Sequence, residues 1–197
     1  MKKIILATQN RGKIREFKQM MAKYEVEVLS LLDINYTDEI EETGMTFEEN
    51  ALIKAREIAL KHHAIVIADD SGLTIDELNG EPGVYSARYA GQMRSDEDNI
   101  DKVLIKLKDV PSDKRTAQFV CVLATVDEVG KETIVRGVCE GEILYERRGL
   151  GGFGYDPIFY LPELEKTMAQ LSDDEKNAIS HRALAFKKLE TMIGELI

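Results

Sequence analysis

Hydrophobic positions follow two spacings along the first part of the chain, and these spacings predict strands and helices in turn. Short apolar runs predict strands at residues 4–7, 25–31 and 64–68. Between them, apolar residues recur at helical spacing over residues 14–24 and 47–61, where Thr46 and Glu49 form a capping box. Alternating strands and helices are typical of parallel pairing in an α/β protein.

The second part of the chain predicts a different strand pairing. A helix is expected from Ser95 to before Pro111, and strands over residues 117–126 and 132–144 look like an antiparallel pair. A capping box at Ser172 and Glu175 precedes a final amphipathic helix, whose inner side holds Ala183, Phe186, Leu189 and Ile193. We therefore expect a mixed sheet, and one domain over residues 1–197 because no repeat or linker interrupts the pattern.

The most unusual stretch is residues 64–72, where an apolar run meets Asp69, Asp70, Ser71 and Gly72. The run reads as a strand buried on both faces that stops at the two carboxylates. Consecutive strand residues point to opposite faces, so Asp69 and Asp70 should differ in role. Their mutual repulsion indicates a cation or a shared proton nearby. An Asp-rich turn after a strand is the alternative.

Composition narrows the function classes. The chain has 197 residues, 44% of them hydrophobic, and a formal net charge of −10, which argues against a non-specific nucleic-acid binder but allows one small polyanion at a local cationic cluster. No apolar run reaches the roughly 18 residues of a membrane span, and the run after Lys3 is too short for a signal-peptide core, so we expect a cytoplasmic protein. Cys121 and Cys139 read as buried free thiols.

Three polar segments could bind a ligand. Residues 8–13 place a hydroxyl, an amide, an Arg and a Lys before a helix, where unpaired N–H groups favour anions, although they also fit a plain polar connection. Glu41 and Glu42 are either a solvated acidic loop or neighbours of Asp70. Phe153 lies among glycines and could stack on a flat ligand or pack inward. His181 beside Arg182 could equally be a helix cap.

These segments belong to a series that spans nearly the whole chain in order: Thr8-Gln9-Asn10-x-x-Lys13, Glu41-Glu42-Thr43-Gly44-x-Thr46-Phe47-x-Glu49-Asn50-Ala51-x-x-Lys54-Ala55, Ala68-Asp69-Asp70-Ser71-Gly72-Leu73, Pro82-Gly83-Val84-Tyr85-Ser86-Ala87-Arg88, Gly152-Phe153-Gly154-Tyr155-Asp156-Pro157 and Lys176-Asn177-x-x-Ser180-His181-Arg182. Together they closely resemble the inosine/xanthosine triphosphate pyrophosphatase family. One departure is Ala169-Gln170-Leu171, where the family often has Ala-Glu-Leu.

The resemblance implies an elongated mixed α/β fold with a central mixed sheet, two lobes and a substrate cleft between them. It also implies hydrolysis of ITP, dITP and XTP to the monophosphate and pyrophosphate with Mg²⁺, usually by a homodimer, which keeps these nucleotides out of DNA and RNA. It gives Glu41 and Asp70 as metal ligands, with Asp70 also the proton acceptor. The substrate-binding residues it implies are Thr8, Gln9, Asn10, Arg11, Gly12 and Lys13 at the phosphates, Ser71, and Phe153, Gly154, Tyr155, Asp156, Lys176, His181 and Arg182 around the purine.

Physical reasoning supports this interpretation and leaves two rivals. A triphosphate with Mg²⁺ needs carboxylates and cations, and donors such as His181 or Arg182 would recognise a 6-keto purine over adenine. A phosphatase with an aspartyl-phosphate intermediate usually needs Asp-x-Asp, whereas Asp69 and Asp70 are adjacent. A nucleotide-binding module without catalysis would not need Lys13, Glu41 and Asp70 together.

Overall fold

The helices and strands that the sequence predicts appear in the expected order, in a computed structural model that describes residues 2–93 and 95–192. Two short strands, Phe159–Leu161 and Lys166–Thr167, are not predicted from the sequence. One seven-stranded sheet has the order β2-β1-β3-β4-β5-β6-β7. The main elements are β1 (Lys2–Leu6), α1 (Arg11–Met21), β2 (Val26–Ser30), α2 (Phe47–His62), β3 (Ile65–Ile75), α3 (Asp96–Lys106), β4 (Thr116–Val126), β5 (Glu132–Ile143), β6 (Phe159–Leu161), β7 (Lys166–Thr167), α4 (Asp173–Ile179) and α5 (His181–Glu190). Ile193, expected on the last helix, lies outside the described residues.

The sheet is mixed, as expected. β1 pairs in parallel with β2 and with β3, whereas β6 pairs antiparallel with β5 and with β7. Polar side chains begin the helices where the sequence indicates: Thr46 and Ser172 form capping boxes with Glu49 and Glu175, and Ser95 caps α3. Local capping therefore determines where these helices start.

The chain forms two compact units, each built from separate segments. Unit 1 contains residues 1–70, 121–137 and 182–197, and unit 2 contains residues 71–120 and 138–181. β3, β4 and β5 each run from one unit into the other. The single domain and the cleft between two lobes that the sequence analysis expects stay predictions.

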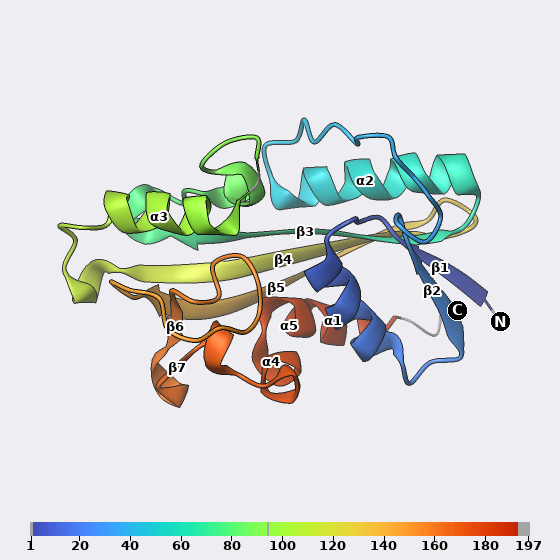
Figure 1. The fold of residues 1–197 in the computed structure, drawn as a ribbon. Coiled ribbons are helices and arrows are strands. Elements are labelled where there is room, and N and C mark those ends of the chain that lie inside the picture. Colours follow the sequence, from blue (N-terminus) through green and yellow to red (C-terminus); the bar gives the residue numbers. More distant parts are fainter. Residues whose placement is uncertain (1, 94, 193–197) are drawn as a thin grey trace. The chain divides into compact units, whose positions relative to one another are not determined.

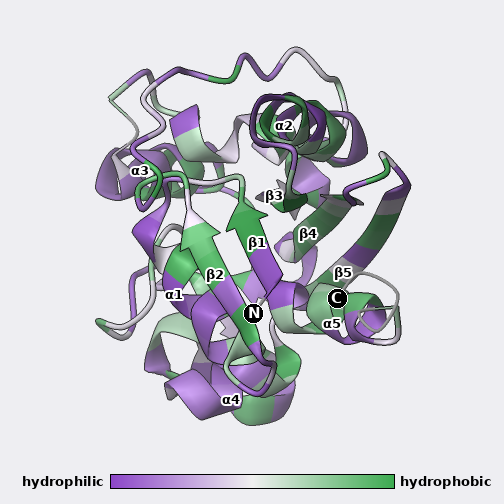
Figure 2. Cartoon of the chain, turned by 90° about the vertical axis from the view of Figure 1, so that its right-hand side faces the viewer, coloured by the Kyte–Doolittle hydropathy of each residue, from purple (hydrophilic) through white to green (hydrophobic). Residues whose placement is uncertain are grey.

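In unit 1, helices cover both faces of the sheet (Figure 1). α2 lies on one face, and α1 and α5 lie on the other. Ile65 and Ile67 of β3 belong to the core shared with Phe17 of α1 and Phe186 of α5. Val66 is also fully buried. In Figure 2, β1 changes from hydrophilic at Lys2 and Lys3 to hydrophobic at its carboxyl end, where it enters this core.

Unit 2 has its own apolar core, to which α3 contributes Ile100 and Val103 and β6 contributes Phe159. Arg115 is buried at its edge, and its guanidinium donates to the backbone carbonyls of Ile143 and Leu107. Carbonyl oxygens thus satisfy a charged group that burial would otherwise penalise.

One prediction about β3 is wrong: the strand does not stop at the two carboxylates. It continues through Asp69, Asp70 and Ser71 as far as Ile75. A strand can carry two buried carboxylates if cations on each face pair with them, because pairing offsets the cost of burial. Asp69 and Asp70 therefore lie within a strand and not in a turn at its end.

Two further observations concern the cysteines and the length of the apolar helices. Both cysteines are buried free thiols, as predicted. Within the described residues, no helix is long and apolar enough to cross a membrane.

Candidate active site

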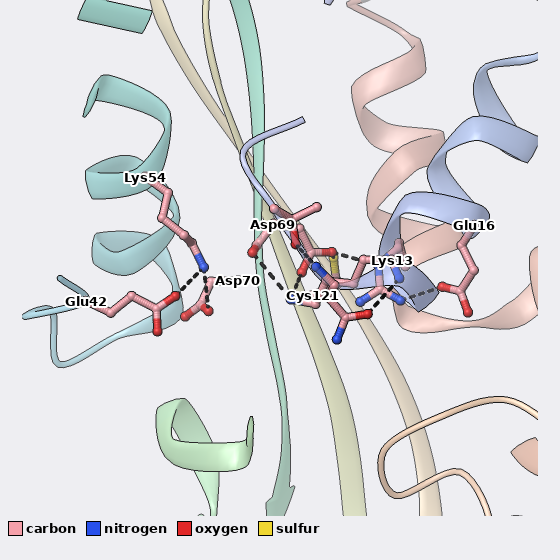
Figure 3. Close-up of polar contacts among 10 residues, drawn as sticks. Lys13, Glu16, Glu42, Lys54, Asp69, Asp70 and Cys121 are labelled. Carbon is pink, nitrogen blue, oxygen red and sulfur yellow. Dashed lines mark hydrogen bonds and ion pairs between the residues drawn. The ribbon is translucent and has the colours of Figure 1, made fainter. Parts of the chain in front are cut away.

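Asp69 faces α1 and α5, where two cations surround its carboxylate. Its Oδ1 pairs with the Lys13 ammonium, and its Oδ2 accepts from Arg182 Nε at 2.7 Å. The Cys121 thiol also donates to Oδ2, at 3.3 Å. Figure 3 shows Lys13, Asp69 and Cys121 together on one side of β3. This carboxylate is fully enclosed by partners from three other elements.

Burial alone would raise the pKa of Asp69, but the charges of Arg182 and Lys13 reverse the effect. They hold the pKa of this carboxyl well below its usual range. Asp69 is therefore ionised at neutral pH and acts as a fixed anion between the two cations.

Asp70 faces α2 and meets a different set of partners. Lys54 of α2 donates to Asp70 Oδ1 at 3.0 Å and to Glu42 Oε1 at 2.6 Å, so that its ammonium lies between two carboxylates (Figure 3). Asp70 Oδ2 is buried and has no hydrogen-bond partner within residues 2–93 and 95–192. The opposite orientations of Asp69 and Asp70 confirm that they differ in surroundings, as the pleat of a strand predicts.

Burial raises the pKa of Asp70 above its usual range, and Lys54 opposes the effect only in part. The pKa of Lys54 is also raised, because Asp70 and Glu42 outweigh its own burial. Asp70 thus combines an oxygen without a hydrogen-bond partner among the described residues with an increased affinity for a proton, and the second property is one that a general base uses.

The predicted phosphate segment, residues 8–13, forms the amino end of α1. Asn10 caps the helix by accepting from the Lys13 backbone N–H at 3.0 Å, and Thr8 Oγ1 accepts from the Asn10 N–H at 3.2 Å. Gln9 is exposed and donates to the Tyr36 carbonyl. Arg11 and Gly12 are the first two residues of the helix. Lys13 thus lies in the first turn, where N–H groups and the helix dipole favour an anion.

The structure gathers Glu42, and not Glu41, beside Asp70. Glu41 is exposed, whereas Glu42 is half-buried and pairs with Lys54. The described residues contain no group of three or more acidic, His or Cys side chains that could hold a metal. Mg²⁺ commonly needs only one or two carboxylates, completed by water and substrate phosphates. Asp70, whose Oδ2 has no hydrogen-bond partner among the described residues, and Glu42 supply two carboxylates of the type that such an ion binds, with the Lys54 ammonium between them.

In unit 2, the segment from Gly152 to Asp156 is held by hydrogen bonds to three elements. Asp156 Oδ2 accepts from the Phe153 N–H at 3.0 Å and from Lys176 Nζ at 2.7 Å, and the same ammonium lies 4.8 Å from the Phe153 ring centre. Asp96 of α3 accepts from the Gly154 N–H, and the Tyr155 hydroxyl donates to the Ser86 carbonyl. These contacts fix the backbone around a half-buried aromatic ring.

Gly152 is the position in this segment at which a side chain would not fit. Its φ is +74°, and a Cβ there would lie 2.0 Å from Asp156 Oδ2. Gly154 has a similar φ of +60° but nothing within 4 Å of a Cβ.

We therefore expect Gly152→Ala to displace Asp156 and to raise the KM for substrate. Gly154→Ala is the matched control, because it costs only a left-handed backbone, about 1 kcal/mol of unfolding free energy. Urea unfolding and steady-state kinetics of both variants test the difference, and equal losses in the two would show that the clash with Asp156 is unimportant.

The remaining predicted site residues divide between the units. Ser71 follows Asp70 on β3 and is half-buried. His181 is buried and stacks on Phe119 with ring centres 4.9 Å apart. Arg182, expected at the purine, belongs instead to unit 1, where its fully buried guanidinium binds Asp69 and Glu16. Arg182 therefore lies beside Asp69, the carboxylate that also pairs with Lys13.

Gln170, which stands where the family often has Glu, makes a local hydrogen bond that shapes the backbone. Its Oε1 accepts from the Thr167 N–H at 2.9 Å and completes a capping box on the short turn Met168–Gln170. A glutamine amide oxygen accepts this bond as well as a carboxylate would.

Sequence reasoning left Glu42 open as a neighbour of Asp70, and it gave no role to Lys54 or Glu16. Lys54 lies one turn after Asn50 in a family motif, and a buried lysine on the inner face of a helix needs an anion. That requirement could have linked Lys54 to Asp70.

A lysine at a helix amino end beside buried carboxylates of a mixed α/β sheet is an arrangement suited to binding phosphate groups. The chain belongs to the Ham1 family, whose family model matches residues 4–192. It is 56% identical over 197 residues to the dITP/XTP pyrophosphatase of Bacillus cereus, covering 99% of this chain and 96% of that protein. It is 55% identical over 194 residues to the dITP/XTP pyrophosphatase of Bacillus subtilis, covering 98% of each.

A solved structure agrees with the fold. The Ham1 protein of Staphylococcus aureus superposes with a TM-score of 0.88 at 46% identity, covering 98% of this chain and 99% of that one. The predicted family and mixed α/β fold are therefore confirmed.

Proposed function

We propose that this chain hydrolyses dITP, ITP and XTP to the nucleoside monophosphate and pyrophosphate, and so keeps these nucleotides out of DNA and RNA. Relatives above 50% identity over nearly the full length are named dITP/XTP pyrophosphatase, which supplies the substrate class. The observation that supports the hydrolytic chemistry is Asp70, whose pKa is raised by burial and whose Oδ2 is buried without a hydrogen-bond partner among the described residues.

The amino end of α1 is the proposed phosphate site. Lys13 contributes an ammonium that Asp69 holds in place, and the first turn of the helix contributes N–H groups. Thr8 and Asn10 shape the turn that leads into it. Fixed cations of this kind neutralise charge on the phosphate oxygens without reorganising during the reaction.

Asp70 and Glu42 are the proposed ligands of Mg²⁺, which, when bound, neutralises phosphate charge and orients the substrate. Asp70 accepts a proton from the attacking water, whose oxygen bonds to the α-phosphorus while the bond from that phosphorus to the α–β bridging oxygen breaks. Pyrophosphate leaves with the bridging oxygen, and the nucleoside monophosphate keeps the oxygen of water. Lys54 holds Asp70 Oδ1, and Asp70 Oδ2 makes no hydrogen bond to the described residues. The site residues of unit 1 thus supply the anionic and the cationic groups that hydrolysis needs.

Unit 2 carries the residues proposed for the purine: Phe153 for stacking, Lys176 and Asp156 to fix its ring, and His181 as a donor to the 6-keto oxygen. The N–H groups of Phe153 and Gly154 are already bonded to Asp156 and Asp96. Adenine would leave a 6-keto donor unpaired, which a site of this type rejects strongly.

The proposed Mg²⁺ site predicts different effects for substitutions at Glu41 and at Glu42. A chelator should abolish turnover and added Mg²⁺ should restore it. Glu42→Gln should raise the Mg²⁺ concentration for half-maximal rate by about tenfold or more, because it removes a carboxylate beside Asp70. Glu41→Gln, one residue earlier and exposed, is the matched control. A larger shift for Glu41→Gln would return the ligand role to that residue.

Assembly as a homodimer and a cytoplasmic location are further parts of the proposal. The nucleotide pool on which this activity would act lies in the cytoplasm. Light scattering of the purified chain would test the dimer, and a monomeric mass would contradict it.

A turnover assay across ATP, GTP, ITP and XTP tests the proposed function against its rivals. We expect rapid turnover of ITP and XTP and slow turnover of ATP and GTP. Equal hydrolysis of simple phosphate esters would indicate a general phosphatase, and binding without turnover would indicate a nucleotide-binding module.

A further inference from the structure

Four charged side chains of alternating sign form a buried row in unit 1: Lys13, Asp69, Arg182 and Glu16. The side chains of Asp69 and Arg182 are each 1% exposed and that of Glu16 is 5% exposed, whereas Lys13 is 15% exposed. The three inner groups are therefore enclosed in protein, and Lys13 is the member that reaches toward solvent. The row balances its charges, as buried ions require.

Glu16 occupies the end of this row farthest from the proposed substrate. It lies three residues after Lys13 on α1, so both side chains share one face of the helix. Its Oε2 accepts from Arg182 Nη1, while Arg182 Nε donates to Asp69 Oδ2. This leaves Asp69 Oδ1 for Lys13. One guanidinium is thus shared between two carboxylates from different elements.

Sharing matters because arginine prefers to bind one carboxylate through two parallel hydrogen bonds. Without the charge of Glu16, Nη1 of Arg182 would turn to Asp69 and compete with Lys13 for Oδ1. The lysine would then lose the anion that fixes its ammonium. Glu16 would therefore act on the position of Lys13 through Arg182 and Asp69.

We propose that Glu16 is a positioning residue for phosphate binding: through Arg182 it keeps Asp69 Oδ1 available to Lys13. The proposal rests on the proposed role of Lys13 at the substrate phosphates. It assigns to Glu16 and Arg182 a part in substrate affinity although both are buried away from solvent.

The test is a double-mutant cycle with Glu16→Gln and Lys13→Ala. Glutamine keeps the shape of Glu16 and removes its charge. We expect Glu16→Gln to raise the KM for dITP by about tenfold and to change kcat by less than about twofold. In the Lys13→Ala background the same substitution should leave KM unchanged, because its effect acts through Lys13. Equal KM increases in both backgrounds would overturn the proposal.

Glu132→Gln is the matched control, since Glu132 forms an exposed ion pair with Arg56 in the same unit. It should leave KM at the wild-type value. If Glu16→Gln does not fold, Glu16→Met replaces it in the cycle, because methionine removes the charge and keeps an unbranched side chain of similar length. The same KM pattern is expected, and an unchanged KM would overturn the proposal.

Binding of inorganic pyrophosphate separates this inference from the proposed function. Calorimetry needs no turnover, so it compares the wild type, Glu16→Gln and Lys13→Ala even if dITP is not hydrolysed. We expect weaker pyrophosphate binding in both single variants and no further loss in the double variant. Loss of dITP turnover in the wild type with this pattern intact would refute the proposed function alone, and wild-type pyrophosphate affinity in Glu16→Gln would refute the inference alone.

Discussion

Asp70→Asn is expected to lower kcat by about 10³-fold while the chain keeps its fold, because a general base contributes roughly that factor. Asparagine has the shape of Asp70 but cannot take a proton from water, and its amide is a poorer metal ligand than a carboxylate. The wild-type carboxyl already has a raised pKa from burial, so a neutral side chain suits this position. Steady-state kinetics with dITP measure kcat, and urea unfolding measures whether the variant keeps its fold.

Asp38→Asn is the control for this substitution. Asp38 is exposed and pairs with Lys61 in the same unit, so the variant loses a carboxylate without touching the site. It should turn over dITP at the wild-type rate. Wild-type turnover in Asp70→Asn would remove Asp70 from the mechanism.

Asp69→Asn is expected to have the largest effect on stability, lowering the free energy of unfolding by about 3 kcal/mol or more. The reason is that Arg182 is 1% exposed and would keep its charge with one buried anion fewer. Lys13 would lose its partner as well. Urea unfolding at about pH 7 measures the loss in wild-type and variant protein.

The pH dependence of this loss follows from the direction of the pKa. Because the folded-state pKa of Asp69 is well below the unfolded value, the stability it contributes is fully present above the unfolded value of about 3.9. It is lost as pH falls toward the folded value. The difference between wild type and Asp69→Asn should therefore be constant above about pH 5 and smaller near pH 3, in metal-free buffer. A difference that grows on acidification would contradict the assigned ion pairs.

Much of the fold follows from local signals in the sequence. Residues 65–68 are apolar on both faces, so the strand is predictable, and Thr46, Ser95 and Ser172 mark helix starts by their own hydrogen bonds. The opposite orientations of Asp69 and Asp70 also follow from the sequence, because strand side chains alternate. These features depend on neighbours in the chain and need no knowledge of distant contacts.

The length of β3 and the placement of the site residues depend on partners that are far apart in the sequence. β3 continues past Asp70 because Lys13, Lys54 and Arg182 arrive from three helices, and no local rule counts those charges. Glu42 lies near Asp70 because both carboxylates pair with Lys54. Arg182 faces Asp69 because of where α5 begins, and one residue earlier His181 stacks on Phe119 in the other unit.

The most direct test of the proposed function is the identity of the products. Phosphorus NMR of dITP incubated with the protein and Mg²⁺ distinguishes which bond breaks. We predict that dIMP and pyrophosphate appear together in equal amounts, with no orthophosphate formed alongside them. Appearance of dIDP and orthophosphate would contradict the account, because it would place the cleavage at the terminal phosphate.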